Sequence, residues 1–127
     1  MSSTHAPDVP GWKTVDTGRD TVVDCWEHPS GVRIFVEERG DSLVSDIETM
    51  PNAPNALNVD LIRRTLPDPV TITDQEVKDR LVKSEEGRGV PTISRDEARK
   101  QVREEKEHII VQKTQNWMVG SNLPLGN

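Results

Sequence analysis

The chain has 127 residues, which is enough for one domain or for a small domain with tails. Hydrophobic residues make up 32% and aromatic residues 3%, so that even with the glycines added the apolar content stays below the roughly 45–50% of an ordinary domain. The net charge of −6 arises in the first half of the chain, and without a clustered basic patch to contact phosphates we expect no nucleic-acid partner.

A single cysteine excludes an internal disulfide framework and a multi-cysteine zinc site, and we expect no cofactor. The longest apolar runs span three residues, far short of the roughly 20 needed to cross a bilayer. The N-terminus also lacks the pattern of a signal peptide. We therefore expect a chain that does not bind membranes and that resides in the cytoplasm or within an assembled particle.

Residues 1–11 are rich in Ser, Thr, Pro and Gly and predict a flexible tail. A β-hairpin region is predicted to follow over 12–47. The runs TVVDCWE and VRIFVEE combine β-branched and aromatic residues, and the intervening HPSG favours a type I turn with a bulge. WKTVDTG is a candidate third strand, because an isolated hairpin is only marginally stable.

The pairing register of the hairpin decides which side chains are buried. If Glu27 pairs with Val32, Trp26 lies opposite Arg33 as a cation–π pair, and the other face is apolar. The members of that apolar face are Val23, Cys25, Val32, Ile34 and Val36. This register gives the cleaner apolar face, and we therefore favour it.

An alternative register arises if Gly31 forms a bulge and His28 pairs with Val32. Cys25 then moves to the opposite face of the hairpin. Its neighbours there would be Val23, Arg33 and Phe35.

Residues 48–56 are rich in Pro and Asn and predict a linker to a helical region over 57–119. LNVDLIRRTL (57–66) predicts a short helix that ends before Pro67. A brief extended segment, VTIT, precedes a second short helix, for which Thr73 and Glu76 form a capping-box pattern.

The longest predicted helix begins at Ser94, which forms a second capping-box pattern with Glu97, and runs to residue 119. Its first half has only two apolar residues, so we expect it to bury little surface. Residues 120–127 form a C-terminal tail. The predicted fold is therefore α+β, with a small N-terminal β-hairpin or meander (about 12–38), two short helices, a long polar C-terminal helix and extended tails.

Cys25 and His28 are the first candidates for chemistry, because a thiolate nucleophile needs a base within reach and a metal needs several such ligands. Residues three apart on a strand point to opposite faces, however, which separates this pair. We interpret Cys25 as a small buried residue and His28 as the start of a turn.

Other patterns also give little support for catalysis. The adjacent acids Glu37–Glu38, Glu85–Glu86 and Glu104–Glu105 show no sign of converging in a cleft, as hydrolytic carboxylates must. Arg63–Arg64 could hold a phosphate, but a solvated helix edge explains it more simply, and no glycine-rich phosphate loop occurs. We predict no catalytic, cofactor-binding or metal-binding residues and hence no enzymatic activity.

The C-terminal segment IIVQKTQNWMVGSNLPLGN is the strongest candidate for binding another protein, because tryptophan and methionine are enriched in interface cores. The same segment could instead pack against the hairpin and complete the core, and both arrangements can hold in an assembly. The residues predicted to contact a partner are Trp12, Trp117, Met118, Val119, Leu123 and Leu125.

The scarcity of core-forming residues predicts a non-catalytic structural or interaction subunit that binds other protein chains as an oligomer or hetero-complex. The most concrete hypothesis is a minor structural protein of a virion or phage, such as a connector or cement protein. Alternatives are a small accessory subunit of a multi-subunit enzyme, an acidic regulator of the antitoxin or inhibitor type that binds a basic surface, and a small enzyme that uses Cys25.

Overall fold

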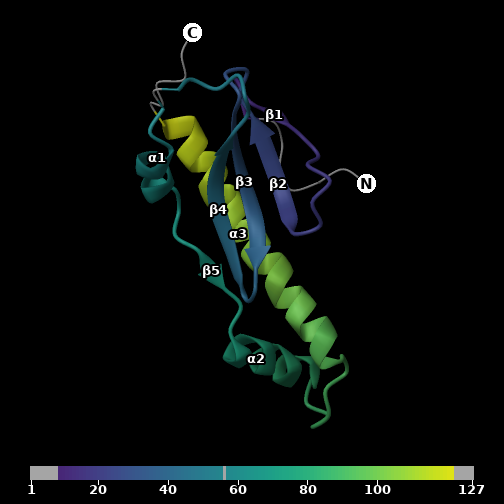
Figure 1. The fold of residues 1–127 in the computed structure, drawn as a ribbon. Helices are drawn as coiled ribbons and strands as arrows, with labels where there is room; N and C mark the ends of the chain where they lie inside the picture. The colour runs from purple at the N-terminus through teal and green to yellow at the C-terminus, as the bar shows by residue number, and fades with distance from the viewer. Residues whose placement is uncertain (1–8, 56, 122–127) are drawn as a thin grey trace.

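The computed structural model describes residues 9–55 and 57–121, which form an α+β fold (Figure 1). The strands are β1 (Lys13–Thr14), β2 (Val22–Glu27), β3 (Val32–Arg39), β4 (Ser42–Thr49) and β5 (Val70–Thr71). The helices are α1 (Val59–Thr65), α2 (Asp74–Ser84) and α3 (Arg95–Gly120). The predicted α+β class is confirmed, although β4 extends the sheet past residue 38, where the sequence patterns place its end.

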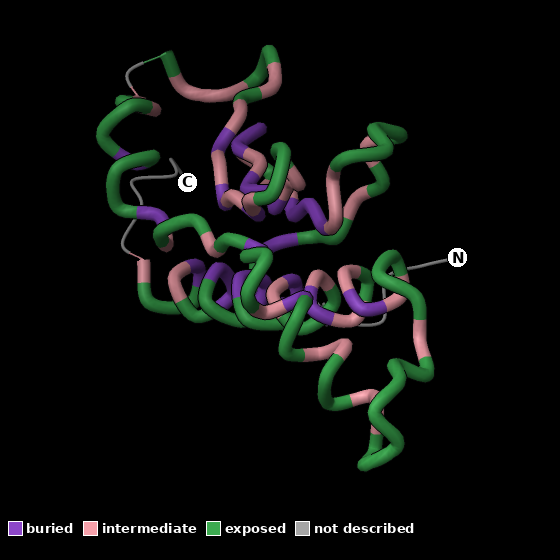
Figure 2. The backbone as a smooth tube through the Cα atoms, turned by 90° about the horizontal axis from the view of Figure 1, so that it is seen from below, coloured by how far each residue is buried: buried purple, intermediate pink, exposed green. Residues whose placement is uncertain are grey.

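The strands form one antiparallel sheet in the order β1-β2-β3-β4-β5, so the chain is a simple meander. Helix α3 runs along one face of this sheet, which we call the inner face (Figure 1). Figure 2 shows buried residues gathered where the sheet meets α3. The fold therefore has two layers with the main core between them.

The main core joins the inner face of the sheet to the C-terminal half of α3. Trp26 and Ile34 are cross-strand partners on the inner face, and neither has exposed surface. Its buried apolar members are Val9, Trp12, Trp26, Val32, Ile34, Val36, Leu43, Ile47, Ile62, Leu66, Ile110, Val111 and Met118. The C-terminal half of α3 thus completes the core within the chain, which is one of the two arrangements that the sequence leaves open.

The hairpin adopts the register with a bulge at Gly31. Trp26 pairs with Ile34, and the backbone N–H of His28 donates to the carbonyl of Val32 over 2.8 Å. The register favoured from the sequence is wrong, because it places Trp26 on the outer face. Burying this one large ring against α3 removes more apolar surface from water than burying Cys25 in its place.

The outer face of the sheet carries Phe35 and Cys25 as cross-strand partners, both buried beneath charged side chains. The Arg19 guanidinium lies 5.1 Å from the centre of the Phe35 ring. The predicted cation–π pair of Trp26 with Arg33 is therefore wrong, since these side chains lie on opposite faces. The ion pairs that cover the outer face are Arg19–Glu48, Arg33–Glu27, Arg33–Glu48, Arg39–Glu37, Arg39–Asp46 and Arg63–Asp46.

Helix α2 and the first half of α3 extend beyond the strands as an arm, residues 72–106 (Figure 1). The arm has a small core of its own, formed by Ile72, Val77, Ala98 and Val102. The polar half of α3 therefore buries its two apolar residues after all, because α2 packs against them. The predicted capping patterns are confirmed in part. The capping box of Thr73 and Glu76 is complete, whereas at the start of α3 the side chain of Ser94 accepts from the backbone N–H of Glu97.

Glu76 holds the arm together through both of its carboxylate oxygens. Oε1 accepts from the Thr73 backbone N–H at 3.2 Å and from its hydroxyl at 2.8 Å, while Oε2 lies 2.5 Å from Nζ of Lys106. The hydrogen bond from Lys106, and then that from Thr73, outweigh burial and lower the pKa of Glu76 below its ordinary value.

Replacing Glu76 with glutamine should lower the free energy of unfolding by about 1 kcal/mol at neutral pH, because a charge-assisted bond and part of the cap are lost.

A carboxyl group whose pKa is lower in the folded state stabilises the fold above its unfolded-state pKa. That contribution is lost as the pH falls through the folded-state pKa. Chemical denaturation should therefore show a wild-type advantage over Glu76→Gln that is constant near neutral pH and shrinks in acid. Glu104→Gln, which alters an exposed acid with no ion pair among the described residues, should have little effect at any pH. An advantage that persists unchanged into acid would contradict the assigned role of Glu76.

Candidate functional site

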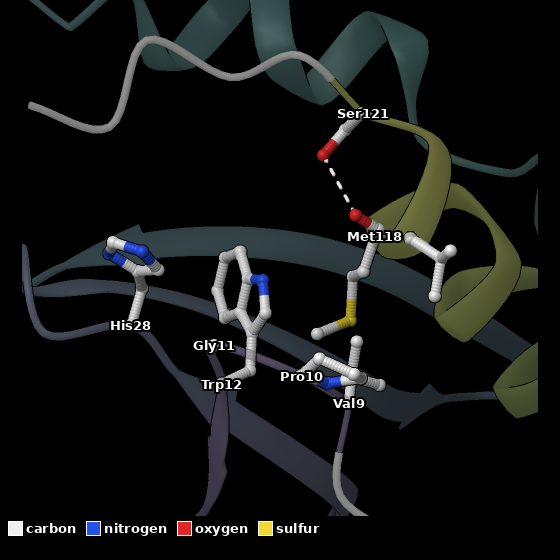
Figure 3. Close-up of a pocket in the computed structure, with 8 residues that line it drawn as sticks. Val9, Pro10, Gly11, Trp12, His28, Met118 and Ser121 are labelled. Atoms are coloured by element: carbon white, nitrogen blue, oxygen red, sulfur yellow. Dashed lines mark hydrogen bonds between the residues drawn. The ribbon is translucent and has the colours of Figure 1, made fainter.

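A pocket of about 290 Å³ lies where the start of the described chain meets the end of α3. It is bounded by the segment that precedes β1, by the β2–β3 turn and by the last turn of α3 (Figure 3). Its lining residues are Val9, Pro10, Gly11, Trp12, His28, Met118, Val119 and Ser121. We call it the Trp12 pocket.

A tight turn brings Trp12 into this pocket. The backbone N–H of Trp12 donates to the carbonyl of Val9 over 2.8 Å, and the turn includes Gly11 with a φ of 87°, a conformation that favours glycine. Trp12 is 8% exposed and Met118 is 3% exposed. Figure 3 shows the indole of Trp12 standing between the imidazole of His28 and the side chain of Met118.

His28 forms the aromatic wall on the other side of Trp12. The two ring centroids are 5.3 Å apart, and the rings meet edge to face at 63°, a favoured aromatic geometry. The backbone N–H of Ser30 donates to Nδ1 of His28 over 3.1 Å. Because Nδ1 accepts this bond, the neutral imidazole carries its proton on Nε2 and offers a second N–H group at the pocket.

The polar side chains among the described lining residues are those of Trp12, His28 and Ser121. The indole N–H of Trp12 has no hydrogen-bond partner among the described residues, whereas the hydroxyl of Ser121 donates to the Met118 carbonyl over 3.0 Å (Figure 3). No Asp, Glu, Lys or Arg is among the described lining residues. The pocket is therefore uncharged, aromatic and able to donate a hydrogen bond.

The structure brings three of the predicted partner-contacting residues together at this pocket: Trp12, Met118 and Val119. Val119 is 71% exposed. Trp117 lies elsewhere, since its indole N–H donates to the hydroxyl of Thr65 in α1 over 3.2 Å. Leu123 and Leu125 lie outside the described residues.

The sequence patterns missed Val9 and His28 as pocket residues. Val9 falls within the predicted tail, yet its side chain is buried in the main core. The sequence predicts that His28 begins a turn, and it does open the β2–β3 turn. The available signal was the alternation along β2, which places His28 two residues after Trp26 and therefore on the same face.

Cys25 and His28 are not brought together. Cys25 pairs with Phe35 on the outer face, whereas His28 contacts Trp12. Desolvation by burial is the main reason that the pKa of Cys25 rises to about 12, despite the nearby charge of Arg33. A thiol with so high a pKa is almost entirely protonated at neutral pH and is therefore a poor nucleophile.

Cys25 should accordingly resist labelling in the folded protein. Because this residue is only 2% exposed, we expect its reaction with a disulfide reagent at neutral pH to be at least about a hundredfold slower in the native chain than in denaturant. The absorbance of the released thiolate measures both rates. Rapid stoichiometric labelling of the native chain would contradict the burial of Cys25.

The remaining candidates serve structural contacts. Nε of Arg63 donates to Asp46 over 2.6 Å, and its Nη1 donates to Asp60 over 2.7 Å. Burial raises the pKa of Asp46, but hydrogen bonds from Arg63 and Arg39 outweigh it and lower that pKa overall. Arg63 is therefore occupied by acids of its own chain.

Within residues 9–55 and 57–121, no group of three or more His, Cys, Asp or Glu side chains is placed to hold a metal ion. Among the described helices, none combines the length and the apolar character that a bilayer-crossing segment needs. Comparison with protein-family models, with curated proteins and with solved structures finds no match to this chain.

Proposed function

We propose that this chain is a non-catalytic interaction subunit that binds another protein chain through the Trp12 pocket. The observation that carries the proposal is the convergence of Trp12, Met118 and Val119 on one uncharged concave surface. Tryptophan and methionine are enriched at the energetic centres of protein interfaces. The scarcity of core residues does not carry the proposal, because α3 completes the main core within the chain.

The most concrete form of this proposal is a minor structural protein of a virion or phage, a connector or cement protein, found in the cytoplasm or within the assembled particle. An accessory subunit of a multi-subunit enzyme is the second candidate, because a pocket that binds another protein chain serves either role. The two differ in the size of the complex.

Size exclusion of native lysate, with the chain followed by an antibody, tests the proposal. We expect elution with a much larger species, and a particle and an enzyme complex separate clearly by size. Val119→Glu places a charge at the rim of the pocket and should release the chain from that species, since Val119 is exposed and its replacement leaves the core intact.

Val82→Glu is the matched control. Val82 is also exposed, but it lies on α2 and does not line the pocket. It should leave the elution unchanged. Elution of the wild-type chain as a free monomer would overturn the proposed function.

A further inference from the structure

The ring of His28 gives the Trp12 pocket a group that changes charge near neutral pH. The other described lining residues include no acid and no base. Nδ1 of His28 accepts from the backbone N–H of Ser30 over 3.1 Å, and the hydroxyl oxygen of Ser30 lies 2.9 Å from the same nitrogen. A protonated imidazole carries a hydrogen on both nitrogens and accepts no hydrogen bond. Protonation of His28 must therefore break the bond from the Ser30 N–H group.

We propose that His28 is a proton-sensitive switch of the Trp12 pocket: the partner chain binds while His28 is neutral and is released when the imidazole takes up a proton in acid. This inference rests on the proposed function and names how that site is regulated.

The bond from Ser30 holds the ring that forms one wall of the pocket. His28 is half-buried, and its ring meets that of Trp12 edge to face at a centroid distance of 5.3 Å (Figure 3). Once Nδ1 carries a hydrogen, it faces the hydrogen of the Ser30 N–H group, and the imidazole has to turn to separate them. The wall beside Trp12 then changes in shape as well as in charge.

The segment before β1 and the last turn of α3 present no acidic side chain to the imidazole. Residues 9–12 and 118–121 are all uncharged. The C-terminal end of a helix carries a partial negative charge, but the backbone N–H and the hydroxyl of Ser121 both donate to the Met118 carbonyl at this end. Figure 3 shows Trp12 standing between Met118 and His28. The end of α3 is therefore a poor counter-charge for a proton on His28.

The charged side chains beside His28 in β2 and opposite it in β1 lie on the outer face of the sheet. Glu27 pairs there with Arg33 over 2.6 Å, and Lys13 is the cross-strand partner of Glu27. From the loop after β4, Asn52 reaches the turn with a neutral amide that donates to a backbone carbonyl. A proton on His28 thus finds no acid on its own face among these neighbours.

Binding of a partner chain covers the pocket and removes water from it. Taking an imidazolium out of water costs more free energy than taking out a neutral imidazole when no counter-charge replaces the water. The apparent affinity then scales with the fraction of the chain in the neutral, binding-competent state. We expect the dissociation constant to rise about tenfold between about pH 7.5 and about pH 5.5, the range over which histidine changes charge.

Nuclear magnetic resonance of the purified full chain over this pH range tests the switch without the partner. We expect the amide proton signal of Ser30 to move upfield along the titration curve of the His28 ring, because water replaces the imidazole as its acceptor. The indole signal of Trp12 should follow the same curve. The indole signal of Trp117, which is bonded to Thr65, should not.

His28→Asn is the matched variant for this measurement. An asparagine side-chain oxygen accepts from the backbone N–H two residues on, so it replaces Nδ1 as the acceptor for Ser30 but does not titrate. The Ser30 signal of this variant should stay in place as the pH falls. A wild-type Ser30 signal that ignores the titration of His28 would overturn the switch.

Size exclusion of native lysate in neutral and in acidic buffer tests the effect on binding. The share of the chain that elutes with the large species, followed over a dilution series, gives the dissociation constant in each buffer. We expect the acidic buffer to weaken binding of the wild type and of His108→Asn alike, since His108 is exposed and does not line the pocket. For His28→Asn, the constant should be the same in both buffers.

The outcomes separate this inference from the proposed function. Wild-type binding that is unchanged or tighter in acid, or equal weakening in His28→Asn, would overturn the inference and leave the proposed function standing. If His28→Asn does not enter the complex at all, the responses of the wild type and of the Ser30 signal decide. A wild-type chain that is a free monomer even in neutral buffer would reject the proposed function itself.

Discussion

Replacing Trp26 with alanine is expected to lower the free energy of unfolding by about 3–5 kcal/mol, the largest stability loss that we expect from truncating a single side chain. The Trp26 side chain has no exposed surface and lies on the inner face opposite Ile34, within the main core. Truncation would remove this apolar surface and leave a large cavity between the sheet and α3. Denaturation by guanidinium chloride, followed by circular dichroism, measures the loss.

Trp26→Phe separates the ring from its N–H group. The indole Nε1 of Trp26 is buried without a hydrogen-bond partner, which costs about 1–3 kcal/mol in a typical core. Phenylalanine removes this unpaired donor while keeping most of the apolar contact, so we expect a loss of at most about 1.5 kcal/mol. Val82→Ala, at an exposed position, should change stability by less than about 0.5 kcal/mol. A Trp26→Ala loss below about 1 kcal/mol would contradict the position of this ring in the core.

The same tryptophan explains why the sequence predicts the hairpin but not its register. Counting apolar residues on each face favoured the pairing of Glu27 with Val32, because that count gives Cys25 and Trp26 equal weight. The observed register places the small Cys25 on the outer face and Trp26 on the inner face, in the main core. Side-chain size, rather than the number of apolar residues, decided between the faces.

The sequence predicts the helices better than the last strands of the sheet. Helix boundaries at Thr73 and Ser94 follow from local capping patterns, which the structure contains in full at Thr73 and in part at Ser94. Strand β4 has a weaker signal, because its inner positions include Ser45 between Leu43 and Ile47. The buried hydroxyl of Thr114 in α3 donates to that of Ser45 over 3.1 Å. A contact between residues so distant in sequence cannot be read from a local pattern.

The composition is low in apolar residues partly because ion pairs cover one face of the sheet. Cys25 and Phe35 are buried on this outer face without a second helical layer. Arg19 lies over the ring of Phe35, and Arg19, Arg33 and Arg39 on this face are each paired with an acid. Long charged side chains can bury apolar surface in this way while their charged groups remain in water. A chain with few apolar residues can therefore still form a complete core.

The pocket depends on residues that no sequence pattern brings together. The sequence identified Trp12 and Met118 as candidates for partner contact from residue type alone. Their proximity requires α3 to cross the sheet and the segment before β1 to return beneath its end, which is a tertiary arrangement. The uncharged character of the site becomes apparent only from that arrangement.

Replacing Gly31 with alanine is expected to lower the free energy of unfolding by about 2–5 kcal/mol, because two effects combine at this bulge. The φ of Gly31 is 93°, which a residue with a Cβ adopts only under strain. A Cβ there would also collide with Oδ1 of Asn52 and lie 2.9 Å from the backbone nitrogen of Ala53. Thermal and chemical denaturation of the variant measure the combined effect.

Gly40→Ala and Asn52→Ala separate strain from collision. Gly40 has a φ of 62°, but a Cβ added there would meet no described atom within 4 Å, so its replacement should show the strain alone, about 1–2 kcal/mol. Adding Asn52→Ala to Gly31→Ala removes the side-chain collision but leaves the backbone of Ala53, and about 1 kcal/mol should return. Equal losses for Gly31→Ala and Gly40→Ala would mean that the 50–53 segment does not pack against the bulge. Because the carbonyl of Gly31 also accepts from the Met50 N–H over 2.7 Å, that result would contradict both the turn and the pairing register that it sets.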